Sequence, residues 1–150
     1  MAYKTETIMA NIGTVLSSIT VANGYENTVG TVLRTAVFPE EEEIPWTSTP
    51  VLIYHFDNAT VEDEKAEYSI WTQNIRIVAI ITPDASTPST KIESLKGDIV
   101  KAVLANRRWS TTFVIDTKIY QILMREGFTK PHAAFTVYLN VRYEAPNSSP

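Results

Sequence analysis

The chain has 150 residues, which suits a single domain, and a formal net charge of -4, which argues against binding nucleic acid over its whole surface. It contains no cysteine, which excludes disulfides, thiolate metal sites and cysteine nucleophiles. The longest apolar run, 77–81, is far shorter than the roughly 20 residues of a membrane span, and no signal peptide is evident. We therefore expect a protein that stays in the cytoplasm where it is made.

The N-terminal segment predicts a helix over 5–21. Its apolar residues recur at helical spacing on one face: Ile8, Ile12, Val15, Leu16 and Ile19. Thr5 is the expected cap, and Asn23-Gly24 is expected to end the helix because glycine accepts left-handed geometry. Gly13 lies inside the helix, where glycine costs about 1 kcal/mol relative to alanine. We expect a neighbouring element to approach closely there.

Apolar residues begin to alternate over 29–37, which predicts a first strand. The loop over 38–50 has three prolines and four consecutive glutamates, which cannot continue a strand. A short strand over 51–56 is apolar on both faces, and the polar segment 57–65 predicts a second loop. A long strand follows over 68–82, with Ile75, Ile77, Ala79 and Ile81 on one face and Arg76, Val78 and Ile80 on the other.

The second helix is predicted to start at Thr87-Pro88 and to end near Asn106. Its apolar stripe consists of Ile92, Leu95, Ile99, Val103 and Leu104. A strand over 118–125 has Ile119 and Leu123 on one face and Tyr120, Ile122 and Met124 on the other. The strand over 134–143 alternates strictly, with Phe135, Val137, Leu139, Val141 and Tyr143 opposite Thr136, Tyr138, Asn140 and Arg142. These last two strands should form a hairpin that turns near Gly127.

The order of elements predicts an α+β fold, a two-layer sandwich with one mostly antiparallel sheet of about five strands and two helices on one face. A single domain is expected over 1–143, with a flexible C-terminal tail over 144–150. Several strands are apolar on both faces, although two helices can cover only one face. We therefore expect self-association to cover the rest. The sequence leaves the strand order open.

Residues that could carry catalysis do not form a recognisable pattern. His55 and Asp57 share a strand face, but a metal site needs three or four ligands and the sequence offers no further cluster. Arg107-Arg108-Trp109 is too short for a nucleic-acid patch, and arginine is favoured at a helix C-terminus for its charge alone. We therefore expect neither an enzyme nor a cofactor or metal.

The acidic run is the sharpest charge feature. It could face a basic partner, bind a cation or repel DNA, although a solvated loop is the favoured interpretation. The candidate interface residues are Glu40, Glu41, Glu42, Glu43, Trp46, Tyr138 and Arg142.

The layout of the chain resembles that of the small tail-terminator and neck proteins of long-tailed bacteriophages. In the first half the resemblance rests on Asn23-Gly24-Tyr25-Glu26-Asn27 after the helix, Val32-Leu33-Arg34, a loop with Pro45 and Pro50, and Val51-Leu52-Ile53-Tyr54. In the second half it rests on Ile75-Arg76-Ile77-Val78, a helix with Leu95, Asp98, Ile99 and Ala102, the pair Arg108-Trp109, and the strand from Val137 to Tyr143. It covers nearly the whole chain in layout, but no single motif in it is diagnostic.

The resemblance implies a structural virion protein at the tail–head junction, assembled in the host cytoplasm. It implies a homohexameric ring that caps the tail tube and joins it to the head connector, while DNA passes through the lumen without specific binding. The implied partners are other copies of the chain, the major tail tube protein and a head connector or neck protein, with no membrane. One alternative is a neck or head-completion protein on the connector side. An alternative of another class is a small host enzyme or ligand-binding domain.

Overall fold

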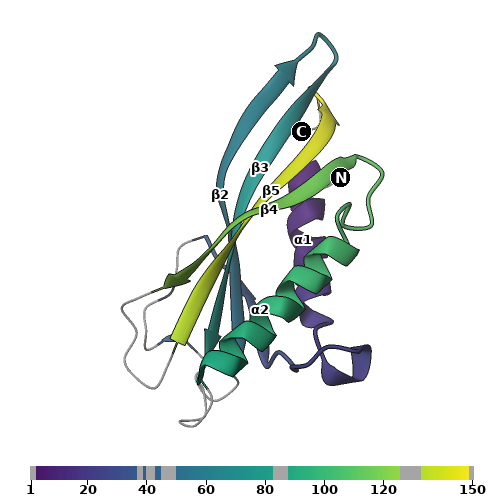
Figure 1. Cartoon of the computed structure of the whole chain (residues 1–150). Coiled ribbons are helices and arrows are strands. Elements are labelled where there is room, and N and C mark those ends of the chain that lie inside the picture. Colours follow the sequence, from purple (N-terminus) through teal and green to yellow (C-terminus); the bar gives the residue numbers. More distant parts are fainter. Residues whose placement is uncertain are drawn as a thin grey trace.

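The computed structural model describes residues 3–36, 39, 43–44, 50–82, 88–125 and 133–148, which form one five-stranded sheet with two α-helices packed on it (Figure 1). In chain order the elements are α1 (Lys4–Ser17), a 3₁₀ turn (Val21–Asn23), β1 (Thr31–Arg34), β2 (Val51–Glu64), β3 (Tyr68–Ile81), α2 (Pro88–Ala105), β4 (Val114–Arg125) and β5 (Ala133–Pro146). The strand order is β1-β2-β3-β5-β4, and only β1 and β2 run parallel. The predicted fold class and the pairing of the last two strands are confirmed.

Both helices cover the same face of the sheet (Figure 1), and a large apolar core lies between them and the strands. The strict alternation of β5 is confirmed, because the side chains that it directs at the helices are all buried: Phe135, Val137, Leu139, Val141 and Tyr143. The helices contribute Ile8, Ile12 and Leu16 from α1 and Leu95, Ile99 and Val103 from α2. Leu104, which was predicted to join the α2 stripe, is instead 45% exposed.

A second apolar cluster lies on the opposite face of the sheet. Val51, Ile53, Val78 and Ile80 are fully buried there, together with Ala134 and with Ile44 from the segment between β1 and β2. The chain therefore covers this part of the sheet itself. The expectation that these strand residues need a second subunit to cover them is wrong, because the sequence did not reveal where Ile44 packs.

The end of α1 also differs from the prediction. The helix stops at Ser17, because the Ser18 hydroxyl donates to the Val15 carbonyl (2.6 Å) and competes with the helical pattern. Gly24 is left-handed as expected (φ 90°), but it closes the 3₁₀ turn instead of α1. Thr5 is not the cap, since α1 already begins at Lys4 after Tyr3.

The segment 57–64 was predicted to be a loop, but it continues β2. Its backbone pairs with β3 as far as Glu64, with bulges between Phe56 and Asn58 and between Val61 and Asp63. The bulges break the two-residue period, and the polar side chains are tolerated because most of them are exposed. Residues 57–74 thus form a hairpin, here called the arm, whose tip lies beyond the N-terminal end of α1 (Figure 1).

The faces of β4 were also assigned wrongly. A bulge between Ile119 and Gln121 shifts the register, so that Ile119 and Ile122 both pack against the core below the helices. Leu123, predicted to share a face with Ile119, is 45% exposed. At the C-terminus, β5 pairs with β3 through Pro146, which is three residues beyond the predicted end of the domain.

Candidate functional site

The face of the sheet opposite the helices is polar along the arm. The register places Arg76, Tyr138 and Arg142 on this face, and Asp57 and Glu62 reach it from β2. Arg76 Nη2 lies 2.9 Å from Asp57 Oδ1, and Arg142 pairs with Glu62. Each of the two arginines is therefore paired with a carboxylate of β2, Arg76 from the adjacent β3 and Arg142 across β3 from β5.

Two aromatic rings continue this face toward β4. The Arg76 guanidinium lies 5.4 Å from the centre of the Tyr138 ring, and the Tyr138 and Tyr120 ring centres are 5.7 Å apart. Tyr120 is half exposed. The result is a hydrated surface on which both arginines are paired and Lys118, opposite Asn140 on the same face, is exposed. Surface ion pairs of this kind contribute only about 0–1 kcal/mol each.

The structure places two of the candidate interface residues, Tyr138 and Arg142, on the same face of the sheet, because they are four positions apart on β5. Glu43 is exposed, next to the buried Ile44, and lies outside this face's ion pairs. Glu40, Glu41, Glu42 and Trp46 lie outside the described residues.

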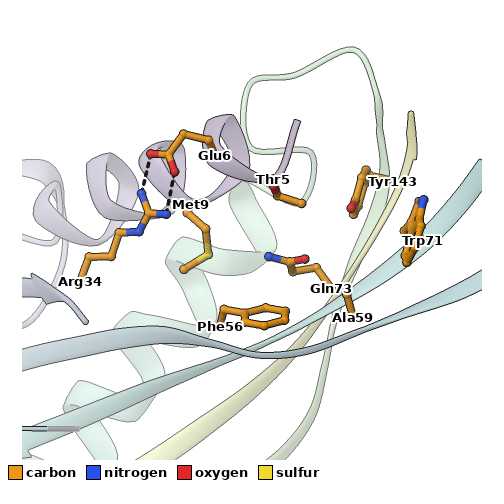
Figure 2. A pocket seen from close by; sticks show the side chains of 9 residues that line it. All are labelled: Thr5, Glu6, Met9, Arg34, Phe56, Ala59, Trp71, Gln73 and Tyr143. Carbon is orange, nitrogen blue, oxygen red and sulfur yellow. Dashed lines mark hydrogen bonds and ion pairs between the residues drawn. The ribbon is translucent and has the colours of Figure 1, made fainter. Parts of the chain in front are cut away.

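A pocket of about 490 Å³ opens on the other face, between the start of α1 and the arm (Figure 2). Its lining residues come from α1 and from four strands: Thr5, Glu6, Met9, Arg34, Phe56, Ala59, Trp71, Gln73 and Tyr143. Figure 2 shows the Glu6–Arg34 pair at one end, Trp71 and Tyr143 at the other, and Phe56 and Gln73 between them. The pocket is there because β1 stops at Arg34, whereas β2 continues.

The charged end of the pocket is closed by a bidentate ion pair. Arg34 donates from Nη1 to Glu6 Oε1 (2.6 Å) and from Nη2 to Glu6 Oε2 (2.8 Å). The hydrogen bonds and charge of Arg34 lower the pKa of Glu6, and the same hydrogen bonds raise the pKa of Arg34. This end therefore presents a satisfied pair and little net charge.

Two largely buried side chains bring polar groups to the wall of the pocket. Gln73 is 4% exposed and Tyr143 is 2% exposed, yet neither side chain makes a hydrogen bond within the part of the chain that the structure describes. Burial raises the pKa of the Tyr143 hydroxyl, so this group stays protonated and can donate. The side-chain atoms of the described residues that are sealed from solvent without a partner are Thr35 Oγ1 and Arg76 Nε, so the polar ends of Gln73 and Tyr143 face the open pocket.

This pocket was not predicted, although the sequence contains one signal of it. Gln73 shares its strand face with Ile75, Ile77 and Ala79, and a glutamine in such a row is unexpected in a sealed core. The other lining residues come from distant segments, and only the fold brings them together.

Metal and nucleic-acid sites receive little support from the described residues. Among these residues no group of three or more His, Asp or Glu side chains is placed to hold a metal, and Asp57 pairs with Arg76 instead of His55. Trp109 is fully buried, so Arg107-Arg108-Trp109 is not an exposed basic and aromatic patch. Neither described α-helix has the length and apolarity to cross a bilayer.

No protein-family model matches the chain, and no curated protein matches it. Its fold is similar to that of a chain in the solved structure of the virion of a native gene transfer agent (GTA) particle, with a TM-score of 0.56. The two sequences are 9% identical, and the similarity covers 95% of this chain and 96% of the other. At this identity the likeness shows a shared fold. The chain is therefore similar, over nearly its whole length, to one chain of a virion particle.

Proposed function

We propose that this chain is a structural virion protein, a tail terminator whose ring caps the tail tube and joins it to the head connector. The observation that supports this most is the fold likeness to a chain of a GTA virion, which spans nearly the whole of both chains. A similarity confined to one motif would not favour a shared place in a particle. The order of helices and strands predicted from the sequence also resembles that of tail-terminator and neck proteins.

The polar face of the sheet, opposite the helices, supports a position around a DNA passage. DNA carries one negative charge per about 1.7 Å of helix axis, so unpaired arginines on the wall of a passage would hold it. Here Arg76 and Arg142 are each paired with a carboxylate, Asp57 and Glu62. A wall of this kind is wet and lets DNA move without being bound. We propose that this face lines the lumen of the ring.

The position in the particle is tested by imaging virions that contain the protein and preparations that lack it. We expect six copies at the tail–head junction, and unjoined heads and tails of irregular length when the protein is absent. A single copy, or absence from the junction, contradicts the proposal. Density on the connector side of the junction, away from the last ring of the tube, favours the alternative of a neck or head-completion protein.

The lumen is tested separately by removing the carboxylates. In assembled rings, Asp57→Asn with Glu62→Gln leaves both arginines unpaired. DNA retention should then increase, with a salt dependence that is steeper because roughly two phosphate contacts are added per subunit. Asp63→Asn is the matched control, because Asp63 pairs with Lys65 at the tip of the arm. Equal retention in all three proteins would remove this face from the lumen.

The acidic run, Glu40 to Glu43, and Trp46 remain proposed contacts with a neighbouring subunit or with the connector. Replacing all four glutamates by glutamine should weaken head joining and change its salt dependence, if the run meets a basic partner. Unchanged assembly, joining and salt response would show a loop that is only solvated.

The alternative from another class is a small host enzyme or ligand-binding domain, and the pocket beside α1 is the feature that favours it. We propose that no catalysis occurs. A metal held by three or more side chains in the purified protein, or a turnover abolished by one substitution, would contradict this.

A further inference from the structure

The two edges of the sheet are unlike in length but complementary in direction. Because β1 pairs with only Val51 to Tyr54, the outer side of β2 from His55 to Glu64 has no strand beside it among the described residues. The opposite edge is β4, which has no strand on its outer side among the described residues, although Arg107 Nε donates to its Thr117 carbonyl (3.3 Å). Free edges are templates for pairing with another chain.

The directions of the strands permit such a pairing between copies. β2, β3, β5 and β4 are successively antiparallel, so β2 and β4 run in opposite directions at the two edges. A rotation about an axis roughly along the strands preserves these directions. It therefore brings β4 of one copy antiparallel to β2 of the next, through a head-to-tail contact that can close into a ring.

The pocket lies beside the free part of β2 and is incomplete in a single copy. Phe56 and Ala59 belong to both the edge and the pocket, and Phe56 is 49% exposed. β1 occupies the edge as far as Tyr54, so an added antiparallel strand has to begin just beyond it. The last residues of β4 then lie beside Phe56.

The two residues before the end of β4, Leu123 and Met124, are apolar and exposed. Met124 is 59% exposed, and it pairs with Phe135, which faces the helices, so Met124 lies on the helix-covered side of the sheet. Phe56 lies on the same side, because it pairs with Ile75. Methionine is flexible, and its sulfur makes favourable contacts with aromatic rings such as Phe56 and Trp71 in the pocket.

We propose that β4 of a second copy pairs with β2 from His55 onward and inserts Met124 into the pocket beside α1. The main chain of the added strand pairs with the free edge, and the Met124 side chain covers the half-exposed Phe56 ring. The charges left on the two strands are opposite in sign, because Glu64 of the arm and Lys118 of β4 are both exposed, whereas Asp57, Glu62 and Asp63 are already paired within the chain. This inference rests on the self-assembly that the proposed function requires.

The test uses disulfide formation in assembled rings, because the chain has no cysteine of its own. Phe56→Cys combined with Met124→Cys should, on oxidation, give a ladder of cross-linked species that ends at the copy number of the ring. An equal mixture of the two single variants should stop at dimers. Phe56→Cys with Leu104→Cys is the matched control, since Leu104 is equally exposed but lies on α2. We expect oxidation of this control to give no cross-linked species.

A second pair of variants separates assembly from folding. Met124→Asp should abolish ring formation while leaving the unfolding transition of the subunit unchanged, whereas Val21→Asp, at a position 61% exposed, should change neither. Rings that assemble normally but give no ladder overturn this inference and leave the proposed function standing. Absence of the protein from the particle junction overturns the proposed function, and a ladder in purified rings would then still support the contact.

Discussion

Gly13 of α1 faces Tyr54 of β2 so closely that a Cβ atom at position 13 would overlap the tyrosine hydroxyl and lie 3.2 Å from its Cζ. The close approach predicted from a glycine inside a helix is therefore confirmed, and its partner is identified. This contact brings the middle of α1 against the sheet, next to the point where β1 and β2 pair.

Gly13→Ala should lower the free energy of unfolding by about 1 kcal/mol, because overpacking costs about 1–3 kcal/mol and the gain in helix propensity returns about 1 kcal/mol. Gly97→Ala is the matched control, since Gly97 is exposed on α2 with open space around its Cα. It should raise the stability by about 0.5–1 kcal/mol. Urea unfolding measures the change in stability for both variants, and equal stabilisation by the two substitutions would contradict the predicted clash.

Asp98 joins α2 to the segment that follows α1. Its carboxylate accepts hydrogen bonds from the backbone N–H groups of Glu26 (3.0 Å) and Asn27 (2.8 Å) and from the Asn27 side chain (2.9 Å). Asp98→Asn turns an amino group toward these donors, so it should cost about 1–3 kcal/mol. Glu93→Gln on the exposed side of α2 should change the stability by less than about 0.5 kcal/mol. Chemical denaturation of the two variants measures both changes in stability. A small loss of stability at position 98 would show that the segment around Glu26 and Asn27 rearranges to find other partners.

Thr117 holds the turn after α2 against β4. Its fully buried hydroxyl accepts from Trp109 Nε1 (2.8 Å) and donates to the Arg107 carbonyl (2.6 Å). Thr117→Val leaves both groups without this partner, and we expect a loss of about 1–3 kcal/mol together with a changed tryptophan fluorescence. Thr60→Val, on the exposed arm, should stay within about 0.5 kcal/mol of the parent. An equally small loss at position 117 would mean that another group takes over both hydrogen bonds.

The Glu6–Arg34 pair should make the stability depend on pH at the acid end. Arg34 lowers the pKa of Glu6 in the folded state, so the unfolded state binds more protons near the ordinary value of 4.5. The contribution of the Glu6–Arg34 pair to the stability is therefore complete above that pH, and it is lost as the pH falls through the lower pKa of Glu6 in the folded state. Glu6→Gln should differ from the parent at pH 7 and converge with it at pH 3, with a smaller difference at high salt. Urea midpoints between pH 3 and 7 test this, and a constant difference would exclude the ion pair as its source.

Several parts of the fold could be predicted from the sequence because their period is local. The alternation in β5 and in the second half of β3 identifies the buried face of each strand, and the stripe of α1 identifies its core side. The segments around Glu26-Asn27 and Asp98, quoted separately for the family resemblance, turn out to bind each other. Sequence alone could not show this, because hydrogen bonds between residues more than 70 positions apart leave no local pattern.

Composition and period alone thus indicated an α+β sandwich and the buried faces of α1, β5 and the second half of β3. Tertiary structure decided the rest: the extension of β2 into the arm, the bulge in β4, the burial of a second cluster by Ile44, and the pocket with Gln73 and Tyr143. Each of these depends on which strand lies beside which, and a shift of one residue at a bulge exchanges the two faces. Whether a strand edge stays free is likewise a property of the assembled sheet, and it is at these free edges that we expect the copies to meet.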